Sequence, residues 1–114
     1  MTKNAESILS KLDGMNGAAI IKKDGTILAS RLPSGIDAKD ISEKVIGIMA
    51  SSEKYSDCVG DSRITHVIIE DSNGILGIAR NGGLFIVGII GPEFDADSAA
   101  SKIKIAASEL QGLV

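Results

Sequence analysis

The chain has 114 residues and a net charge of −3, with acidic and basic residues interspersed, so it suits one domain with its own core and disfavours a nucleic-acid partner. Aromatic residues make up only 3% of the chain, which leaves few rings for stacking on bases or sugars. The single cysteine, Cys58, excludes an internal disulfide and any multi-cysteine metal site. Without a signal-peptide pattern or an apolar run near the ~18 residues of a membrane span, we expect a soluble cytoplasmic protein that does not insert into membranes.

The first 31 residues predict a helix followed by a β-hairpin. Residues 4–13 carry apolar side chains at helical spacing, and Gly14 follows as a stop signal. The runs 18–23 and 26–31 have strand character and are separated by Asp24-Gly25. Because this dipeptide tolerates positive φ, we expect a tight type I′ turn between two antiparallel strands.

An amphipathic helix of about four turns is predicted to start at Asp37, which can act as its N-cap. A loop is expected at 55–62, around Gly60. One stripe of this helix is expected to be buried, and it consists of Ile41, Val45, Ile48, Met49 and Ser52.

The other side of this helix is unusually small and partly apolar. Ile46 and Ala50 lie well away from the predicted stripe, and Gly47 and Ser51 lie beside them. A solvated helix face normally carries Glu, Lys and Arg, so one interpretation is that the same helix of a second copy packs there. The alternative is a surface that merely tolerates small residues.

The second half of the chain predicts three strands in an up-and-down meander. The strands are 63–70, 75–80 and 84–90, joined by tight turns at 71–74 and 81–83. The run 84–90 has no ionisable side chain at any position. We therefore place it in the middle of a sheet that helices cover on both faces.

The register of the last two strands has two alternatives. If Gly82-Gly83 forms the two-residue loop, Gly77 lies opposite Gly88, and a helix could approach the sheet closely there. If the loop begins one residue earlier, Gly77 meets Ile86 instead.

The chain ends in a predicted helix that starts at Asp95 or Asp97. Its apolar positions follow a 3.6-residue repeat: Ala96, Ala99, Ala100, Ile103, Ala106, Ala107, Leu110 and Leu113. The order helix, two strands, helix, three strands, helix predicts an α+β fold of three layers, α/β/α. We expect the two terminal helices on one face of the sheet and the middle helix on the other.

Reactive groups are sparse. His66, the only histidine, is flanked by Ile64 and Ile68 and is better interpreted as a packed or interface residue than as a catalyst. No nucleophile is paired with an orienting base, and the glycines match no phosphate-binding motif. We therefore predict no enzyme activity and no catalytic, cofactor-binding or metal-binding residue. Three arginines could stabilise phosphate charge on a partner's nucleotide, although surface roles are favoured: Arg31, Arg63 and Arg80.

The hairpin at 16–29, NGAAIIKKDGTILA, and the later segment 81–88, NGGLFIVG, resemble the roadblock family of dynein light chains and their prokaryotic relatives. The resemblance covers nearly the whole chain. It implies a single domain over 1–114 with a five-stranded antiparallel sheet of order 2-1-5-4-3. These motifs are structural, so they carry no catalytic residue onto this sequence.

The resemblance also implies a partner and an assembly. Family members dimerise by pairing the third strands and packing the second helices together, and prokaryotic members act with small Ras-like GTPases as activators or effectors. The implied dimer interface comprises Ile46, Gly47, Ala50, Ser51, Arg63, Thr65, His66 and Val67. The implied GTPase-binding surface comprises Ile46, Gly47, Ala50 and Lys54.

The leading hypothesis is therefore a non-enzymatic homodimeric regulator or scaffold for a small Ras-like GTPase. One alternative is a small-molecule sensor, because folds of profilin and longin shape can open a pocket beside the sheet. The few convergent polar groups argue mildly against it. The other alternative is a dynein-type light chain adaptor.

Overall fold

The computed structural model describes residues 4–12, 14–59, 65–72, 74–91 and 95–110. Its elements follow the predicted order of helix, two strands, helix, three strands and helix. Along the chain they are α1 (Ala5–Leu9), continued by the short 3-10 helix η1 (Ser10–Leu12), β1 (Gly17–Lys22), β2 (Ile27–Arg31), α2 (Ala38–Val59), β3 (His66–Asp71), β4 (Gly74–Asn81), β5 (Leu84–Ile90) and α3 (Ala96–Ser108).

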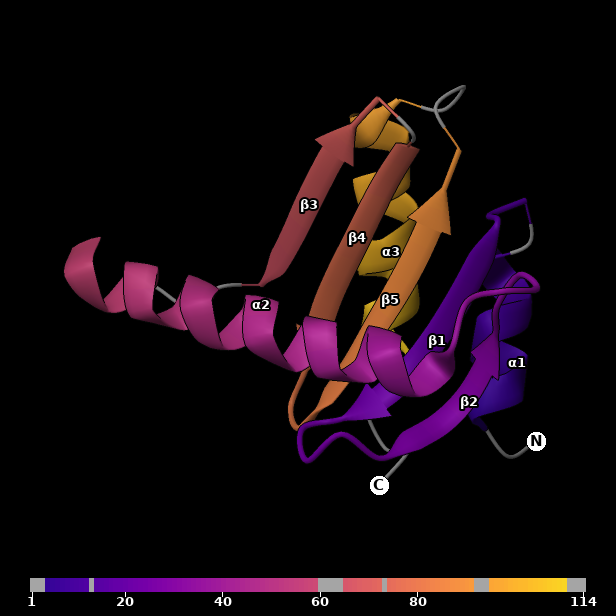
Figure 1. Ribbon diagram of the computed structural model, residues 1–114, viewed down its shortest axis with the longest axis horizontal. Helices are drawn as coiled ribbons and strands as arrows, with labels where there is room; N and C mark the ends of the chain where they lie inside the picture. Colours follow the sequence, from indigo (N-terminus) through magenta and orange to yellow (C-terminus); the bar gives the residue numbers. More distant parts are fainter. Residues whose placement is uncertain (1–3, 13, 60–64, 73, 92–94, 111–114) are drawn as a thin grey trace.

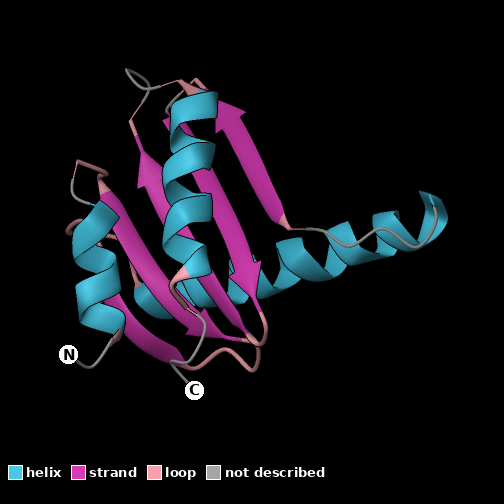
Figure 2. Cartoon of the chain, turned by 180° about the vertical axis from the view of Figure 1, so that it is seen from behind, coloured by secondary structure: helices cyan, strands magenta, loops and turns pink. Residues whose placement is uncertain are grey.

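The strands form one antiparallel sheet of five in the order β2-β1-β5-β4-β3, which confirms the order that the family resemblance implies. β5 lies in the middle, as predicted from its apolar sequence. Figure 1 shows α2 in front of the sheet, and Figure 2 shows α1 and α3 on the opposite face. The fold is therefore a three-layer α+β sandwich with both terminal helices on one side.

The side chains of β5 alternate between two cores, one on each face of the sheet. Ile86 is fully buried in the cluster that includes α1 and α3, and Val87 is fully buried in the cluster beneath α2. Ile20 and Ile21 of β1 divide in the same way. Because successive side chains of a strand point to opposite faces, these two strands require helices on both sides.

A pair of glycines lets α3 pack closely on the sheet. Asn81 faces Leu84 across the β4–β5 turn, so Gly77 lies directly opposite Gly88, the first of the two predicted registers. Ile103 of α3 is fully buried over this pair. A Cβ added to Gly77 would overlap the Cδ1 atom of Ile103, and one added to Gly88 would lie 3.1 Å from the same atom.

The turn between β1 and β2 is a three-residue loop, and the predicted type I′ turn is wrong. Gly25 donates its N–H to Lys22 O at 2.9 Å, and Lys22 donates its N–H to Thr26 O at 2.7 Å. Gly25 has a φ of +98°, whereas no described non-glycine residue has a positive φ, and a type I′ turn needs one at both central positions. The carboxylate of Asp24 stabilises the loop by accepting the N–H of Thr26 at 2.9 Å.

α2 is longer than its apolar stripe predicts, and it occupies part of the stretch expected to be a loop at 55–62. The helix continues to Val59, one residue before Gly60. Between Asp37 and that point the sequence has no proline and only one glycine, Gly47, so no strong stop signal interrupts the helix. Two residues predicted to begin the next strand, Arg63 and Ile64, lie outside the described residues.

Asp95, one of the two predicted N-caps, is the N-cap of α3. Oδ1 of Asp95 accepts the backbone N–H of Ser98 at 2.7 Å, and this hydrogen bond holds the pKa of the Asp95 carboxyl below its ordinary value. Ile103 and Ala106 of the predicted repeat are buried against the sheet, whereas Leu113 lies outside the described residues.

Replacing Gly77 by alanine is expected to lower the free energy of unfolding by about 1–3 kcal/mol, because the new methyl group overlaps Ile103 in a packed core. Gly88→Ala should cost less, since its first contact is the flexible, half-buried side chain of Met15. Gly83→Ala in the adjacent turn is the matched control, with no atom within 4 Å of the added Cβ. Urea denaturation measures all three, and equal stability of Gly77→Ala and Gly83→Ala would contradict the close packing.

Candidate functional site

α2 reaches beyond the sheet that it covers. It has 22 residues, so it is about 33 Å long at 1.5 Å per residue. Figure 1 shows it crossing the sheet obliquely, with its C-terminal turns extending past the edge formed by β3. Within the described residues, no strand of the sheet lies beneath that end of the helix.

The middle of the outward face of α2, around Gly47, is open and carries small residues, as the sequence predicts. Gly47, Ala50, Ser51 and Lys54 are all exposed. Apart from the neighbouring backbone of the helix itself, no atom of the described residues lies within 4 Å of the position that a Cβ on Gly47 would take. The structure thus brings four of the predicted interaction residues onto one accessible face, where their role stays a prediction.

Ile46 is the exception, and its predicted place away from the buried side is wrong. It is half-buried and packs against the core beneath α2, together with Ile41 and Ile48. The reason is that the β1–β2 turn lies beside the helix, so α2 contacts the protein over a wider arc than its apolar stripe predicts. Ser42, which the stripe omits, is buried on the same side.

The two edges of the sheet differ in their readiness to pair with another strand. β3 is six residues long and keeps an unbroken register with β4. β2 has five residues and a register shift at Ile20 and Ile21 of β1, the irregularity of a β-bulge. Short and bulged edges resist strand pairing, whereas regular ones favour it.

Alternate backbone groups of β3 point away from the sheet. Arg80 donates its N–H to Thr65 O at 3.2 Å, so Thr65 and Arg80 are a hydrogen-bonded pair of the antiparallel ladder. Because bonded and non-bonded pairs alternate, His66, Ile68 and Glu70 direct their backbone N–H and C=O groups outward. This edge of the described sheet therefore offers donors and acceptors to another strand.

The predicted interface residues near β3 lie at this edge. Thr65 is exposed, and its Oγ1 lies 3.0 Å from Nδ1 of His66. His66 is half-buried, and Val67 packs against the core beneath α2. Arg63, the remaining member of the set, lies outside the described residues.

Part of the sheet face on the α2 side is bare. α2 crosses near the β4–β5 turn and leaves the other end of β3, β4 and β5 uncovered (Figure 1). Ile69 is 41% exposed there, and Leu76 and Ile89 are half-buried. With Asn16 and Gly74 among others, they line a hollow of about 310 Å³. An apolar surface of this kind, beside an open strand edge, is typical of a protein-protein contact.

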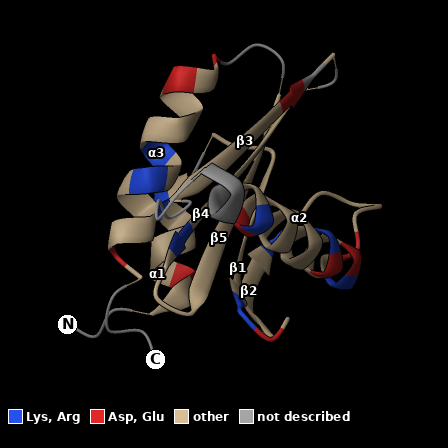
Figure 3. Ribbon diagram, turned by 90° about the vertical axis from the view of Figure 1, so that its left-hand side faces the viewer, with Lys and Arg blue, Asp and Glu red and all other residues tan. Residues whose placement is uncertain are grey.

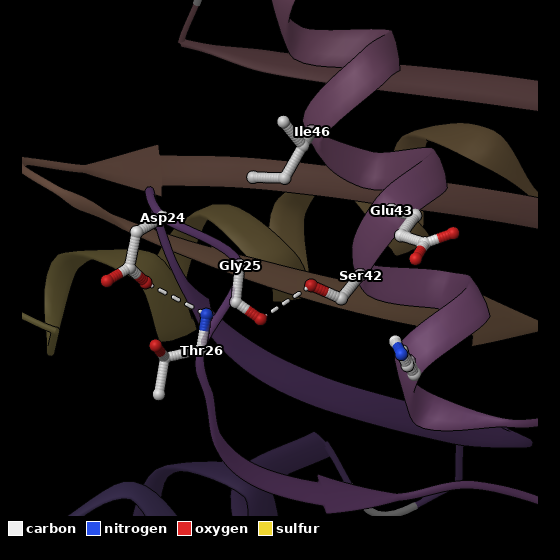
Figure 4. Close-up of a pocket in the computed structure, with 7 residues that line it drawn as sticks. Asp24, Gly25, Thr26, Ser42, Glu43 and Ile46 are labelled. Carbon is white, nitrogen blue, oxygen red and sulfur yellow. Dashed lines mark hydrogen bonds between the residues drawn. The ribbon is translucent and has the colours of Figure 1, made fainter.

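A recess of about 490 Å³ lies between α2 and the β1–β2 turn (Figure 4). One wall is the turn itself. The other wall is one side of α2, which contributes four residues at spacings of three, one and three. The hydroxyl of Ser42 donates to the backbone oxygen of Gly25 at 2.8 Å and ties the two walls together. The lining residues are Asp24, Gly25, Thr26, Lys39, Ser42, Glu43 and Ile46.

Charged residues lie on both walls of this recess. Figure 3 shows acidic and basic residues on the N-terminal half of α2 and at the β1–β2 turn, while the strands behind are mostly uncharged. The N–H of Thr26 holds the pKa of the Asp24 carboxyl below its ordinary value, so Asp24 is ionised at neutral pH. Glu43 and Lys39 complete the charged part of the lining.

Two of the three arginines considered from the sequence are described. Arg80 forms an ion pair with Glu53, which links β4 to α2, and Arg31 is exposed on β2. Within the described ranges, no group of three His, Cys, Asp or Glu side chains is placed to hold a metal ion. No helix in those ranges combines the length and hydropathy needed to cross a bilayer.

Comparison with known proteins agrees with this architecture. The family model for the Roadblock/LC7 domain matches residues 3–90, which is most of the chain. The chain therefore belongs to the Roadblock/LC7 domain family.

Its relatives are distant. The uncharacterised protein MJ0714 of Methanocaldococcus jannaschii is 30% identical over 66 residues, which cover 58% of this chain and 56% of that protein. The chain thus spans little more than half the length of the curated relatives it matches. The structure of Myxococcus xanthus MglB aligns with a TM-score of 0.78 at 17% identity, over 91% of this chain and 85% of MglB. A Roadblock/LC7 domain from Streptomyces avermitilis aligns with a TM-score of 0.79 at 14% identity, over 94% and 91% of the two chains.

The recess was not predicted from the sequence, because its walls come from separate segments. Ser42 and Gly25 are 17 residues apart, and nothing in either local pattern indicates that they meet. One signal was available: Ser42 continues the spacing of Val45 and Met49, so it falls on the buried side of α2. A buried hydroxyl needs a hydrogen-bond partner.

Removing the Ser42 hydroxyl should loosen the tie between α2 and the turn. Ser42→Ala is expected to lower the free energy of unfolding by about 0.5–1.5 kcal/mol, since the bond to Gly25 O is lost. Ser101→Ala, exposed in the middle of α3, is the matched control with the same gain in helix propensity. Thermal and urea unfolding measure the difference. If the two variants are equally stable, the hydrogen bond does not hold the turn.

Proposed function

We propose that this chain is a non-enzymatic, homodimeric regulator or scaffold that binds a small Ras-like GTPase. The observation that carries the proposal is that an open, regular edge strand and an overhanging helix occur on the same side of the molecule. Members of the roadblock family work through such surfaces and act with GTPases by binding them. The family membership makes this the expected role.

Strand pairing supports the self-association. The outward backbone groups of His66, Ile68 and Glu70 match those of the same strand in a second copy related by a two-fold axis. Antiparallel pairing of the two β3 strands would make a continuous sheet. The bulged β2 edge offers no comparable surface, so the two edges are not interchangeable.

The helix supports the same arrangement. A two-fold axis beside β3, perpendicular to the sheet, would carry the overhanging turns of one α2 over the other copy. They would then approach the bare end of that sheet face, where Ile69, Leu76 and Ile89 are accessible. The overhang and the bare face are thus mutually complementary, and burial of apolar surface would drive the association.

The GTPase is expected on the surface that the two α2 helices of the dimer form together. Gly47 and Ala50 present little side chain there, so another backbone can come close, and Lys54 adds an exposed positive charge. Ile46 is turned toward the recess beside the turn, so within the proposed surface it contributes an apolar rim.

The small-molecule sensor is a weaker candidate. A mainly apolar pocket between the end of β5 and α3, lined by residues that include Met15, Ile90, Ala99 and Lys102, has a volume of about 200 Å³. Ligand pockets typically hold about 300–1,000 Å³ and are lined mainly by apolar side chains. The recess beside the β1–β2 turn has such a volume, about 490 Å³, but Ile46 is the one large apolar residue in its lining. We therefore keep the binding-protein hypothesis.

The family resemblance implies that the two α2 helices of the dimer pack together with Gly47 in their contact. Gly47→Arg is therefore expected to weaken the dimer at least about ten-fold, because it would bring two long charged side chains together there. The monomer should tolerate the change, since nothing surrounds Gly47 within 4 Å. Light scattering and sedimentation over a concentration series measure the effect, with Ser101→Arg on the outward face of α3 as the control.

Glu70→Pro tests the strand edge independently. Its N–H points away from β4, so proline removes an outward donor without breaking the internal ladder. For Gly47→Arg and for Glu70→Pro, we expect a smaller fraction of dimer than in the wild-type chain, with unfolding still cooperative. A wild-type chain that stays monomeric at all concentrations would rule out the interface.

Lys54→Glu is expected to weaken GTPase binding about ten-fold by reversing one charge at the contact, while leaving the dimer intact. The measurement is calorimetric titration with a Ras-like GTPase encoded near this chain, loaded with GTP analogue or GDP, alongside GTP hydrolysis. Lys102→Glu on α3 is the control. Failure of the wild-type dimer to bind any such GTPase in either state would contradict the proposed partner.

A further inference from the structure

Tyr55, the one tyrosine of the chain, is exposed on α2. At 64% it is the most exposed of the large hydrophobic side chains that the structure describes. It lies four residues before Val59, where the helix ends, and the C-terminal turns of this helix extend past β3 (Figure 1). An aromatic side chain removes about 150–250 Å² of surface from water when it packs. A ring left in water on an overhanging helix is therefore suited to anchor a partner.

The position of Tyr55 along the helix indicates which flank of α2 carries it. Ile48 packs against the core beneath α2, and Tyr55 follows it after about two turns at 3.6 residues per turn. Ile46 lines the recess beside the β1–β2 turn, and Tyr55 follows it after about two and a half turns, so the two lie on opposite sides of the helix. Tyr55 therefore lies on the flank that faces away from this turn, toward the end of the sheet that α2 leaves bare.

The hollow at the bare end of the sheet can receive an aromatic ring. Ile69 lies opposite Leu76 in the pairing of β3 and β4, and Leu76 lies opposite Ile89 in the pairing of β4 and β5. The three side chains thus form an apolar row across three strands, and they line the hollow of about 310 Å³. Among its described lining residues none is charged, and Asn16 alone has a polar side chain, which can bond to a phenol hydroxyl.

We propose that Tyr55 of each copy anchors the dimer by packing into the hollow lined by Ile69, Leu76 and Ile89 of the second copy. The inference rests on the proposed two-fold pairing of β3, which brings each overhang to the bare end of the other sheet and directs Tyr55 back onto it. Each chain supplies both anchor and receptor, so the contact forms twice and closes. The backbone bonds along β3 replace bonds to water and give a modest net gain, so apolar burial must supply most of the association energy.

The fluorescence of Tyr55 reports the contact directly, because the chain has one tyrosine and no tryptophan. Acrylamide quenching is measured over a concentration series, with light scattering on the same samples. As the dimer forms, the quenching constant should fall at least about two-fold, since the ring leaves water. A dimer whose Tyr55 is quenched as freely as that of the monomer would overturn the anchor and leave the dimer in place. A chain that stays monomeric, with Tyr55 quenched freely throughout, would overturn both.

Variants then separate the anchor from a general loss of apolar surface. Tyr55→Ala should raise the dissociation constant of the dimer at least about ten-fold, whereas Tyr55→Phe, which keeps the ring, should change it less than about three-fold. Ile105→Ala is the matched control, because it removes a side chain that is 63% exposed on α3. Ile69→Ala should also weaken the dimer, and its effect should be smaller in a chain that already carries Tyr55→Ala. Equal effects of Tyr55→Ala and Ile105→Ala, or fully additive effects of Tyr55→Ala and Ile69→Ala, would overturn the proposal.

Discussion

The structure depends on the need to cover β5 on both faces. Ile86 and Val87 are both fully buried on opposite sides of this central strand, so the chain must supply helices to each side. On one side, the Gly77–Gly88 pair lets α3 approach closely enough for Ile103 to fill the gap. Two helices share that face, and α2 covers the other.

The surfaces available for recognition follow from the distribution of the helices over the two faces of the sheet. One oblique helix cannot cover a whole face of the sheet, so Ile69, Leu76 and Ile89 remain accessible at its uncovered end. The same oblique course carries α2 past β3 and leaves the regular edge of that strand beside the overhang. The bulge at β2 weakens the opposite edge for pairing. The asymmetry of the fold thus concentrates its binding potential on one side.

Much of this could be predicted from local pattern. The uniformly apolar run 84–90 indicates the central strand. The turn sequence at 81–83 limits the pairing of β4 and β5 to two registers. The observed register places two glycines beneath Ile103, a tertiary contact that the local sequence does not indicate. Strand order came from family resemblance. The recess lay beyond prediction, because its walls come from the β1–β2 turn and from α2, which come together only in the folded chain. The predicted position of Ile46 is wrong for the same reason, because helical periodicity does not indicate that a turn lies beside the helix.

Amide hydrogen exchange along β3 tests the central claim most directly. In a dimer paired through this strand, the outward amides of His66, Ile68 and Glu70 become hydrogen-bonded, so their protection should rise with protein concentration toward that of Val67 and Ile69. Protection that stays low at every concentration, while Val67 and Ile69 remain protected by β4, would contradict recognition through this edge.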